Sequence, residues 1–244
     1  MLKILSYILT TLFYFLFLVV LVIFHPIQYI CFKFFGYQAH KTSVDVLNFF
    51  LKLLAGVLGV RSSYEGNRNL PTNRPLIIVS NHQGTYDIPP LVWLFRKHHP
   101  KFISKIELAK NIPSVSFNLR HGGAALIDRK KRAQAIPEIY KLGQLIAENN
   151  YAACIFPEGT RSKTGKMRPF KSGGIETLLK AAPNALIVPF VVDGNYRIEK
   201  NGMFPLNIGQ RVFYSILEPI EPEGLTATEI TELAEKQIRE KLNQ

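Results

Sequence analysis

An uncharged apolar run near the N-terminus limits the folds open to this chain more than any other segment does. The 21 residues ILSYILTTLFYFLFLVVLVIF, from Ile4 to Phe24, contain no charged side chain. As a helix the run would be about 32 Å long, close to the hydrocarbon thickness of roughly 30 Å of a bilayer. A cleaved signal peptide is disfavoured, because the run is long and the following FHPIQ offers no small-residue cleavage site. The sequence therefore predicts an uncleaved N-terminal membrane anchor.

A second apolar stretch, VDVLNFFLKLLAGVLGV, runs from Val44 to Val60. It either lies in the membrane interface or forms the return arm of a hairpin, and the sequence leaves both open. Only Lys3 precedes the first run, whereas four basic residues follow it, namely Lys33, Lys41, Lys52 and Arg61. This bias predicts that the main domain faces the cytoplasm, as in a protein of the bacterial inner-membrane type.

The charge of the chain indicates an anionic partner. Among 244 residues, Lys and Arg outnumber Asp and Glu by 30 to 18, which gives a net charge of +12. Nucleic acid, an anionic membrane surface and a phosphorylated substrate all fit such a balance. The predicted anchor favours anionic membrane lipids, so nucleic acid is not the expected partner. The two cysteines lack metal-ligand spacing, and redox chemistry gains no support.

From Tyr64 onward, short apolar runs alternate with helical patterns. The runs PLIIVS, KFISK, AALID, AACIF and ALIVPFVV are predicted strands, and RVFYSILEPI is a further strand near an edge. Helices are expected near 88–97, 114–120, 130–149 and 173–182, with an amphipathic terminal helix capped by Thr226 or Thr228. This alternation predicts an α/β fold with a mixed, mostly parallel sheet flanked by helices.

Polar residues gather in three loops that follow predicted strands. NHQGTYD (81–87) follows PLIIVS, Asp128 and Arg129 end GGAALIDR, and FPEGTRS (156–162) follows AACI. Loops at the carboxyl ends of parallel strands meet at one edge of a sheet, where α/β proteins place their ligands. The stretch 161–171 adds five basic residues and no acidic one. Together the loops predict one site for an anionic substrate.

His82 and Asp87 stand five positions apart in the first loop and allow two interpretations. Asp87 opens the predicted helix DIPPLVWLF, so it is a candidate N-cap beside an ordinary loop histidine. In the second interpretation, neutral His82 takes a proton from a hydroxyl that attacks a carbonyl carbon, while Asp87 fixes the tautomer of the histidine. One carboxylate can serve both roles, and this chemistry needs no serine or cysteine nucleophile.

The other two loops supply groups that suit a phosphate. Arg161 and Arg129 match phosphate oxygens through forked hydrogen bonds, and backbone N–H groups around Gly159 can assist. Glu158 either accepts a hydrogen bond from an acceptor hydroxyl or orients a basic neighbour, and Lys105 either contacts an anionic substrate or is simply solvated. No cluster has the ligand set of a zinc or two-metal site, so no metal is expected.

Four segments make a family resemblance specific. NHQGTYD, GAALIDR, FPEGTRS and IVPFVV resemble, in order and spacing, the motif blocks of the glycerolipid acyltransferase family, which includes the 1-acylglycerol-3-phosphate acyltransferases. The resemblance covers about residues 64–220 and implies that His82 and Asp87 are the catalytic pair. It also implies that the acceptor phosphate is bound by Arg129, Glu158, Gly159 and Arg161. Asn81, Lys105 and Thr160 are further candidate substrate-binding residues.

The resemblance also implies a reaction and a division of the chain. We expect a membrane-anchoring helical segment at 1–62 and an acyltransferase domain at 63–244. The reaction moves a fatty acyl group from acyl-CoA or acyl carrier protein to the sn-2 hydroxyl of 1-acylglycerol-3-phosphate (lysophosphatidate), giving phosphatidate without a cofactor. Glycerol-3-phosphate or another lysophospholipid is the alternative acceptor. A non-catalytic membrane-bound module that binds lipid or nucleic acid is the alternative from another class.

Overall fold

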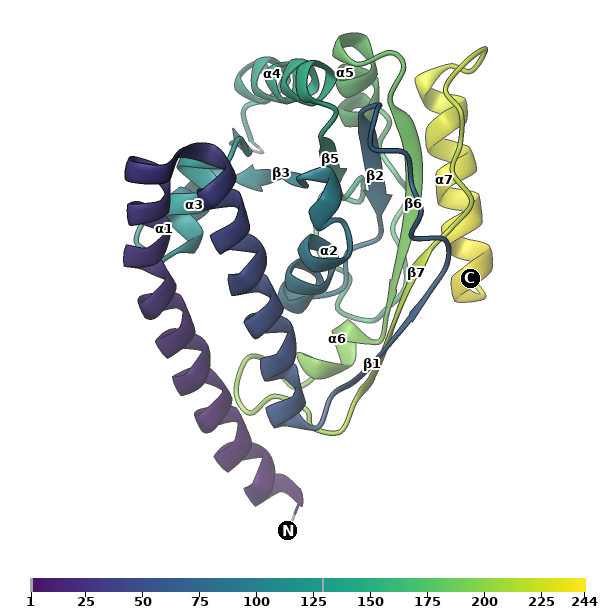
Figure 1. Ribbon diagram of the computed structural model, residues 1–244. Helices are drawn as coiled ribbons and strands as arrows, with labels where there is room; N and C mark the ends of the chain where they lie inside the picture. The colour runs from purple at the N-terminus through teal and green to yellow at the C-terminus, as the bar shows by residue number, and fades with distance from the viewer. Residues whose placement is uncertain (1, 129) are drawn as a thin grey trace.

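The structure is a computed structural model that describes residues 2–128 and 130–244. A long N-terminal helix precedes alternating strands and helices (Figure 1). The helices are α1 (Leu2–Leu54), α2 (Ile88–Leu94), α3 (Val115–His121), α4 (Arg132–Asn149), α5 (Gly173–Ala181), α6 (Asn195–Ile198) and α7 (Ala227–Leu242). The strands are β1 (Arg61–Glu65), β2 (Leu76–Ser80), β3 (Lys101–Lys105), β4 (Ala125–Ile127), β5 (Ala152–Ile155), β6 (Leu186–Asp193) and β7 (Arg211–Ile216).

One sheet joins all the strands that the described residues form. Its order is β1-β7-β6-β2-β5-β3-β4, and each neighbouring pair is parallel except β6 with β7. The central strands β2, β5 and β6 are buried on both faces, which explains why their sequences are continuous apolar runs. The predicted mixed, mostly parallel sheet flanked by helices is confirmed.

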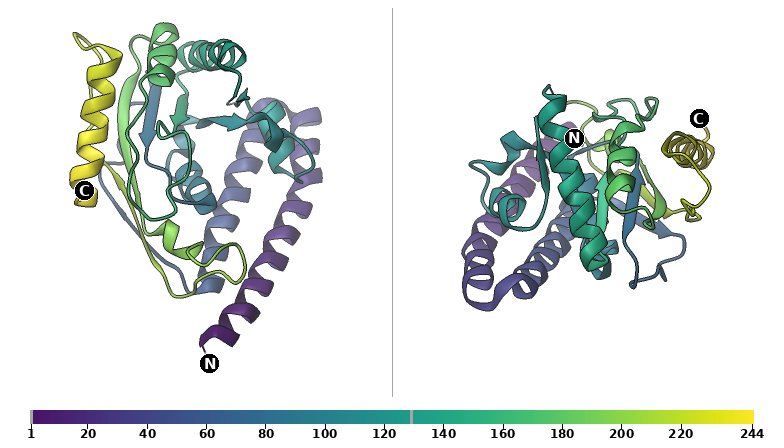
Figure 2. Two further views of the ribbon diagram at one scale, coloured as in Figure 1. Left: turned by 180° about the vertical axis from the view of Figure 1, so that it is seen from behind. Right: turned by 90° about the horizontal axis from the view of Figure 1, so that it is seen from above.

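Each face of the sheet carries its own core. In β2, Leu76 and Ile78 belong to one apolar cluster and Ile77 and Val79 to the other, as the alternation of side chains along a strand requires. Helices α4, α5 and α7 cover the second face. Helix α2 and part of α1 cover the first, and Figures 1 and 2 show the sheet between these two layers. Loops at the carboxyl end of β2 therefore emerge between well-packed elements.

Helix α1 is a hairpin. Gly36 has a φ of 76° and a ψ of −168°, so the helix breaks there and folds back. The outgoing arm (residues 2–35) and the return arm (residues 37–54) meet through Leu21, Leu47 and Leu51, and the rings of Phe24 and Phe50 are 5.9 Å apart. Of the two placements left open for the second apolar stretch, the structure has the return arm of a hairpin.

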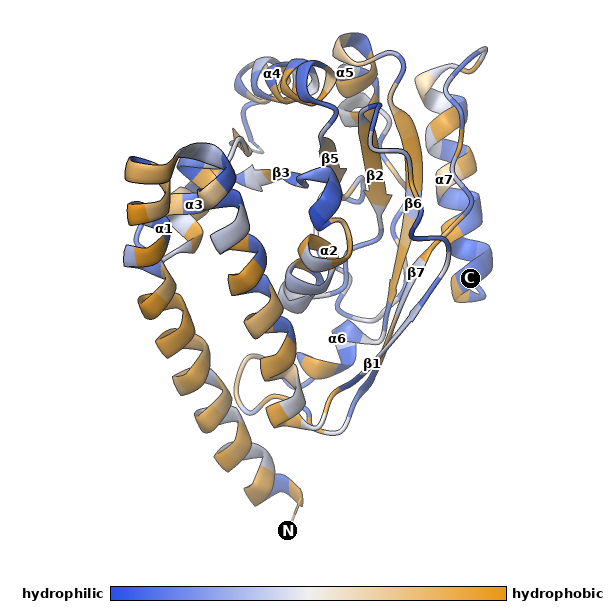
Figure 3. Ribbon diagram, in the orientation of Figure 1, coloured by the Kyte–Doolittle hydropathy of each residue, from blue (hydrophilic) through white to orange (hydrophobic). Residues whose placement is uncertain are grey.

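The hairpin presents many apolar side chains to its surroundings. Phe15 is 62% exposed, and Phe34 and Phe35 at the tip are 66% and 71% exposed. Figure 3 shows the apolar colouring along both arms. Among the described residues, one helix (Leu2–Leu58) is long and apolar enough to cross a membrane, and only 17% of its apolar window is buried. Apolar surface on this scale associates the protein with a membrane.

Two details of the fold refine the predictions. Thr226, not Thr228, caps α7, since its hydroxyl accepts from the backbone of Glu229 and the Glu229 carboxylate accepts from the backbone of Thr226. Strand β1, with the sequence RSSYE, was not predicted. It is an exposed edge strand paired with β7, so its residues carry no apolar signal.

Candidate active site

The first loop begins at the carboxyl end of β2, in the middle of the sheet. Every residue of this strand is buried, and His82 follows two positions after its end. Asn81 is 1% exposed, and its side-chain amide makes two hydrogen bonds with the backbone of Val192 in β6. It donates to the carbonyl (2.7 Å) and accepts from the N–H (2.9 Å). These two bonds tie the start of the loop to the neighbouring strand.

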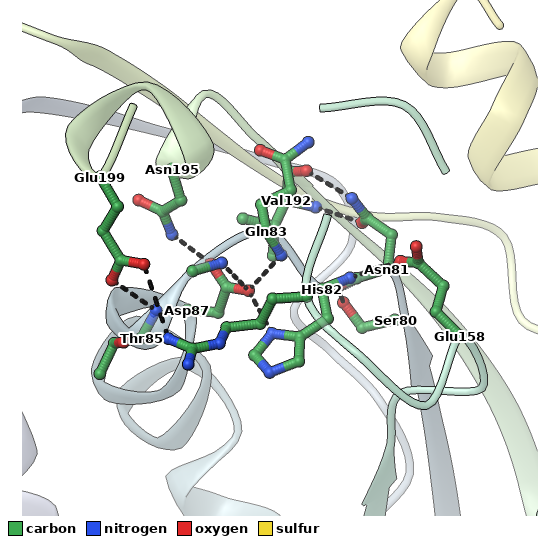
Figure 4. A network of polar contacts seen from close by, with 12 residues as sticks. Ser80, Asn81, His82, Gln83, Thr85, Asp87, Glu158, Val192, Asn195 and Glu199 are labelled. Carbon is green, nitrogen blue, oxygen red and sulfur yellow. Dashed lines mark hydrogen bonds and ion pairs between the residues drawn. The ribbon is translucent and has the colours of Figure 1, made fainter. Parts of the chain in front are cut away.

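His82 and Asp87 form a hydrogen-bonded pair. The distance from Nδ1 of His82 to Oδ2 of Asp87 is 2.7 Å, and Figure 4 shows the two side chains facing each other. An ionised carboxylate only accepts hydrogen bonds, so Nδ1 of a neutral His82 carries the proton and Nε2 presents a lone pair. The His82 side chain is 14% exposed, whereas the Asp87 side chain is completely buried. This arrangement suits a general base whose tautomer is fixed.

The Asp87 carboxylate turns back toward its own loop. Its Oδ2 accepts from the backbone N–H groups of Gln83 (2.7 Å) and Gly84 (3.1 Å), which closes the short 3₁₀ turn Thr85–Asp87. Asp87 stands at the N-cap of α2, but its side chain makes no capping hydrogen bond with that helix. The prediction that it caps α2 is therefore wrong, because the turn and His82 occupy Oδ2 and the side chain of Asn195 occupies Oδ1.

A residue that the sequence reasoning missed holds the other oxygen of Asp87. Asn195 is 1% exposed, and its Nδ2 donates to Oδ1 of Asp87 (2.6 Å) and to the hydroxyl of Tyr214 (3.1 Å). Asn195 opens α6 directly after β6, where Gly194 has a φ of 93° and a Cβ would lie 2.3 Å from a backbone oxygen. The sequence did hold one signal for Asn195: Asp-Gly-Asn follows the predicted strand ALIVPFVV, so it lies at the same edge of the sheet as the first loop.

The FPEGTRS loop also holds His82 in place, through both its ring and its backbone. The ring of Phe156 stacks on the imidazole with centroids 4.1 Å apart and an angle of 18°. The backbone N–H of His82 donates to Oε1 of Glu158 (2.8 Å), and the backbone carbonyl of His82 accepts from the N–H of Ser162 (2.7 Å). Ring and main chain of the candidate base are thus held by one loop 76 positions further along the chain.

Glu158 connects backbone groups. It is 4% exposed, and besides His82 it accepts from the backbone N–H of Arg168 (3.0 Å). Burial raises the pKa of this carboxyl, and the two N–H donors partly oppose the rise. In the described part of the chain no basic side chain forms an ion pair with it, so the carboxylate is engaged by two main-chain donors.

Arg161 lies at the rim of the same site. Its side chain is 48% exposed, it donates to the hydroxyl of Thr85, and its Nη1 lies 3.5 Å from Oε2 of Glu199. Glu199 also accepts from the backbone N–H of Thr85 (3.1 Å), as Figure 4 shows. The guanidinium is therefore placed beside the first loop while part of it stays open to solvent.

The remaining predicted site residues differ in position. Lys105 ends β3 and is exposed, Gly159 has a φ of 70° with no atom within 4 Å of an added Cβ, and Thr160 is half-buried. Arg129 lies outside the described residues. The structure thus brings the first and third loops together around His82.

Comparisons with known proteins agree with this geometry. A family model described as Acyltransferase matches residues 61–193. The chain is 34% identical over 191 residues to 1-acyl-sn-glycerol-3-phosphate acyltransferase of Saccharomyces cerevisiae, covering 77% of this chain and 60% of the relative. It is 28% identical over 196 residues to the human alpha form, covering 80% and 67%. The chain thus spans about three fifths to two thirds of the length of these relatives.

One solved structure is similar to this chain over nearly the whole length of both proteins. The crystal structure of the 1-acyl-sn-glycerophosphate (LPA) acyltransferase PlsC from Thermotoga maritima superposes with a TM-score of 0.79 at 27% sequence identity. The superposition covers 100% of this chain and 97% of that one. The likeness therefore extends to the N-terminal hairpin.

Proposed function

Because this chain belongs to the acyltransferase family, we propose that it transfers a fatty acyl group from a thioester to the sn-2 hydroxyl of 1-acylglycerol-3-phosphate, forming phosphatidate. The observation that carries the proposal is the pairing of His82 with Asp87, which leaves Nε2 as the free, basic nitrogen. The names of the relatives, 1-acyl-sn-glycerol-3-phosphate acyltransferases, support the choice of lysophosphatidate as the acceptor.

The pair accounts for each proton in the transfer. Nε2 of His82 takes the proton of the acceptor hydroxyl as its oxygen bonds to the thioester carbonyl carbon, and the imidazolium is stabilised by buried Asp87. When the tetrahedral intermediate collapses, the carbon–sulfur bond breaks and the thiolate takes the proton from His82. A positioned base of this kind contributes roughly 10²- to 10⁴-fold to the rate. The chemistry requires no cofactor.

The rim of the site suits the phosphate of the acceptor. Arg161 offers a partly exposed guanidinium beside the first loop, and its fork matches two phosphate oxygens. Lys105 and Arg129 complete the proposed basic surroundings, Arg129 on the strength of the family resemblance. Glu158 acts by holding the two loops together, because both of its oxygens already accept backbone N–H groups.

The hairpin suits an enzyme whose acceptor and product are lipids. Residues 1–62 are the proposed membrane-anchoring segment and residues 63–244 the acyltransferase domain, and the exposed apolar side chains of both arms support this division. We place the domain on the cytoplasmic side, where acyl-CoA and acyl carrier protein are the candidate donors. The net charge of +12 favours contact with anionic membrane lipids.

A single-turnover assay tests the proposal. Purified full-length protein in detergent is mixed with an acyl thioester and lysophosphatidate, and phosphatidate and free thiol are measured by mass spectrometry. The wild type should form both in equal amounts, and His82→Ala should lower the rate roughly 10²-fold or more while thermal unfolding stays cooperative. Absence of product, or equal rates in both proteins, would reject the proposal. Glycerol-3-phosphate and other lysophospholipids serve as competing acceptors.

A further inference from the structure

A cavity with polar and charged side chains lies between the hairpin and the sheet. It has a volume of about 480 Å³, part of which is open to solvent. The return arm, the start of β3 and helix α3 line it, and its polar lining includes Tyr37, His40, Lys41, Asp45, Lys101 and Asn118. None of them holds His82 or Asp87, so this cavity is separate from the candidate active site.

Lys101 brings an uncompensated charge into this cavity. It is 7% exposed, and no carboxylate of a described residue lies within ion-pair distance of its ammonium. One of its three N–H donors reaches the hydroxyl of Tyr37 (2.8 Å), and the ammonium lies 4.8 Å and 5.3 Å from the ring centres of Tyr37 and Tyr151. Two donors of a buried ammonium thus remain without a hydrogen-bond acceptor among the described residues, which is costly unless a ligand supplies one.

The neighbouring groups do not neutralise this charge. Lys41 and Asp45 pair with each other across 2.6 Å, so their charges cancel. His40 is 1% exposed, and neither of its ring nitrogens has a hydrogen-bond partner in the part of the chain that the structure describes. The cavity therefore has a net positive charge, unused ammonium donors and an imidazole without a partner.

We propose that this cavity binds a phosphate group, with Lys101, His40 and the amide of Asn118 as its ligands. A phosphate presents several acceptor oxygens in a tetrahedral arrangement, which suits an ammonium and an imidazole N–H that approach from different elements. A free phosphate ion and the phosphate of a lipid headgroup share this chemistry. Tyr37, which lines the cavity, follows exposed Phe34 and Phe35 at the hairpin tip. A lipid headgroup is therefore the favoured source of the phosphate.

Thermal unfolding of the full-length protein in a neutral detergent tests the proposal. Because inorganic phosphate also suits the candidate active site, all proteins carry Arg161→Ala, which removes the exposed guanidinium there. A ligand that binds only the folded state raises the melting temperature in a concentration-dependent way. Inorganic phosphate should therefore raise it, whereas chloride at equal ionic strength should not.

Three variants locate the binding. Lys101→Gln should weaken the apparent affinity for phosphate about tenfold or more, and His40→Phe, which keeps the ring contacts with Phe32 and Phe117, should also weaken it. Lys97→Gln makes the same charge change at an exposed lysine outside the cavity and should leave the affinity unchanged. If Lys101→Gln fails to fold, His40→Phe decides the question. Equal stabilisation of parent and both cavity variants, or none in the parent, would overturn the proposal.

A second probe identifies the source of the phosphate. Dodecyl phosphate is added to the micelles, with dodecylphosphocholine as a control whose phosphate is a diester. If dodecyl phosphate stabilises the protein at a far lower concentration than inorganic phosphate, and Lys101→Gln abolishes the effect, a lipid headgroup is the ligand. If dodecyl phosphate and inorganic phosphate stabilise the protein at equal concentrations, the site is supported and free phosphate is its ligand. Stabilisation that does not depend on Lys101 contradicts the site.

Discussion

Asn195 donates a hydrogen bond of 2.6 Å from Nδ2 to Oδ1 of Asp87, across 108 positions of the chain. Oδ2 of the same carboxylate faces Nδ1 of His82. The direction in which the candidate base points therefore depends on the turn between β6 and α6.

Replacing Asn195 by Ala should lower kcat while changing KM little. The buried carboxylate would lose a donor, at a cost of roughly 1–3 kcal/mol, and the His82 ring would lose its fixed direction. If that energy is lost in the transition state, kcat falls about ten- to a hundredfold. Asn207→Ala is the control, since the side chain of Asn207 donates to the backbone carbonyl of Arg197 in the same region. Similar kcat values in the two variants would show that Asn195 does not position the pair.

Arg161→Lys distinguishes a phosphate ligand from a surface charge. As a ligand, the guanidinium binds two phosphate oxygens where lysine offers a point charge, so kcat/KM for lysophosphatidate should fall about ten- to a hundredfold. An acceptor without the phosphate should lose little. Arg74→Lys is the control, because Arg74 precedes β2, at the end of the strand away from the first loop, and pairs with Glu221. Equal losses on both acceptors, or none, would remove Arg161 from the phosphate site.

Glu158→Gln tests whether this carboxylate joins the two loops. The carboxylate accepts from the backbone of His82 and of Arg168 with different oxygens, whereas an amide has only one acceptor oxygen. One buried N–H would face an NH₂ group, so the free energy of unfolding should fall by roughly 1–3 kcal/mol and turnover should fall with it. Glu138→Gln, which breaks a surface pair with Lys141, should change neither. Lost turnover at unchanged stability would instead favour direct contact between Glu158 and the acceptor.

Phe13→Ala should disturb the site from within the hairpin. Phe13 is 1% exposed, and its ring lies 5.4 Å from the ring of Tyr86, the residue before Asp87. Loss of such a buried ring lowers the free energy of unfolding by about 3–5 kcal/mol. The space left by the ring also removes support from the turn that holds Asp87. Phe15→Ala removes an exposed ring from the same helix and should leave the melting temperature in detergent unchanged. Equal melting temperatures for the two variants would contradict this packing role.

The stability of the fold should rise with pH above 8. Burial, reinforced by Lys41, lowers the pKa of Lys101 to about 8 from an ordinary value of 10.5. Between these values the unfolded chain binds more protons than the folded one, so stability increases with pH by up to about 1.4 kcal/mol per unit. Melting temperatures in phosphate-free buffer from pH 8 to pH 9.5 check this against Lys101→Met, which lacks the titrating group. Parallel pH curves for the two proteins would contradict it.

The sequence predicted the central sheet because β2, β5 and β6 are buried on both faces and consist of continuous apolar residues. Strand β1 escaped detection because an exposed edge strand needs no apolar pattern. Its partner β7 lies about 150 positions further along the chain, a distance over which local patterns carry no information.

The site was predictable only in part. His82, Asp87 and Arg161 lie in loops rich in polar residues after predicted strands, and this marked them in advance. Asn195 is a single asparagine after a glycine, a common turn pattern, and only the packing of α6 against the first loop gives it a function. The burial of Lys101 was equally hidden, since it depends on where the return arm packs.

The hydrogen bonds of the Asp87 carboxylate keep it in place behind the imidazole of His82. Its two oxygens accept from four N–H donors, supplied by His82, Gln83, Gly84 and Asn195, which is about the number of lone pairs that a carboxylate presents. In the proposed reaction, the proton that Nε2 of His82 receives stays on the imidazole, because the four donors hold the carboxylate in place as the acceptor of Nδ1–H. It leaves by Nε2, through which it came, when the departing sulfur of the thioester takes it up. The proton then ends on the product thiol, and the protein returns to the ionisation state in which it began.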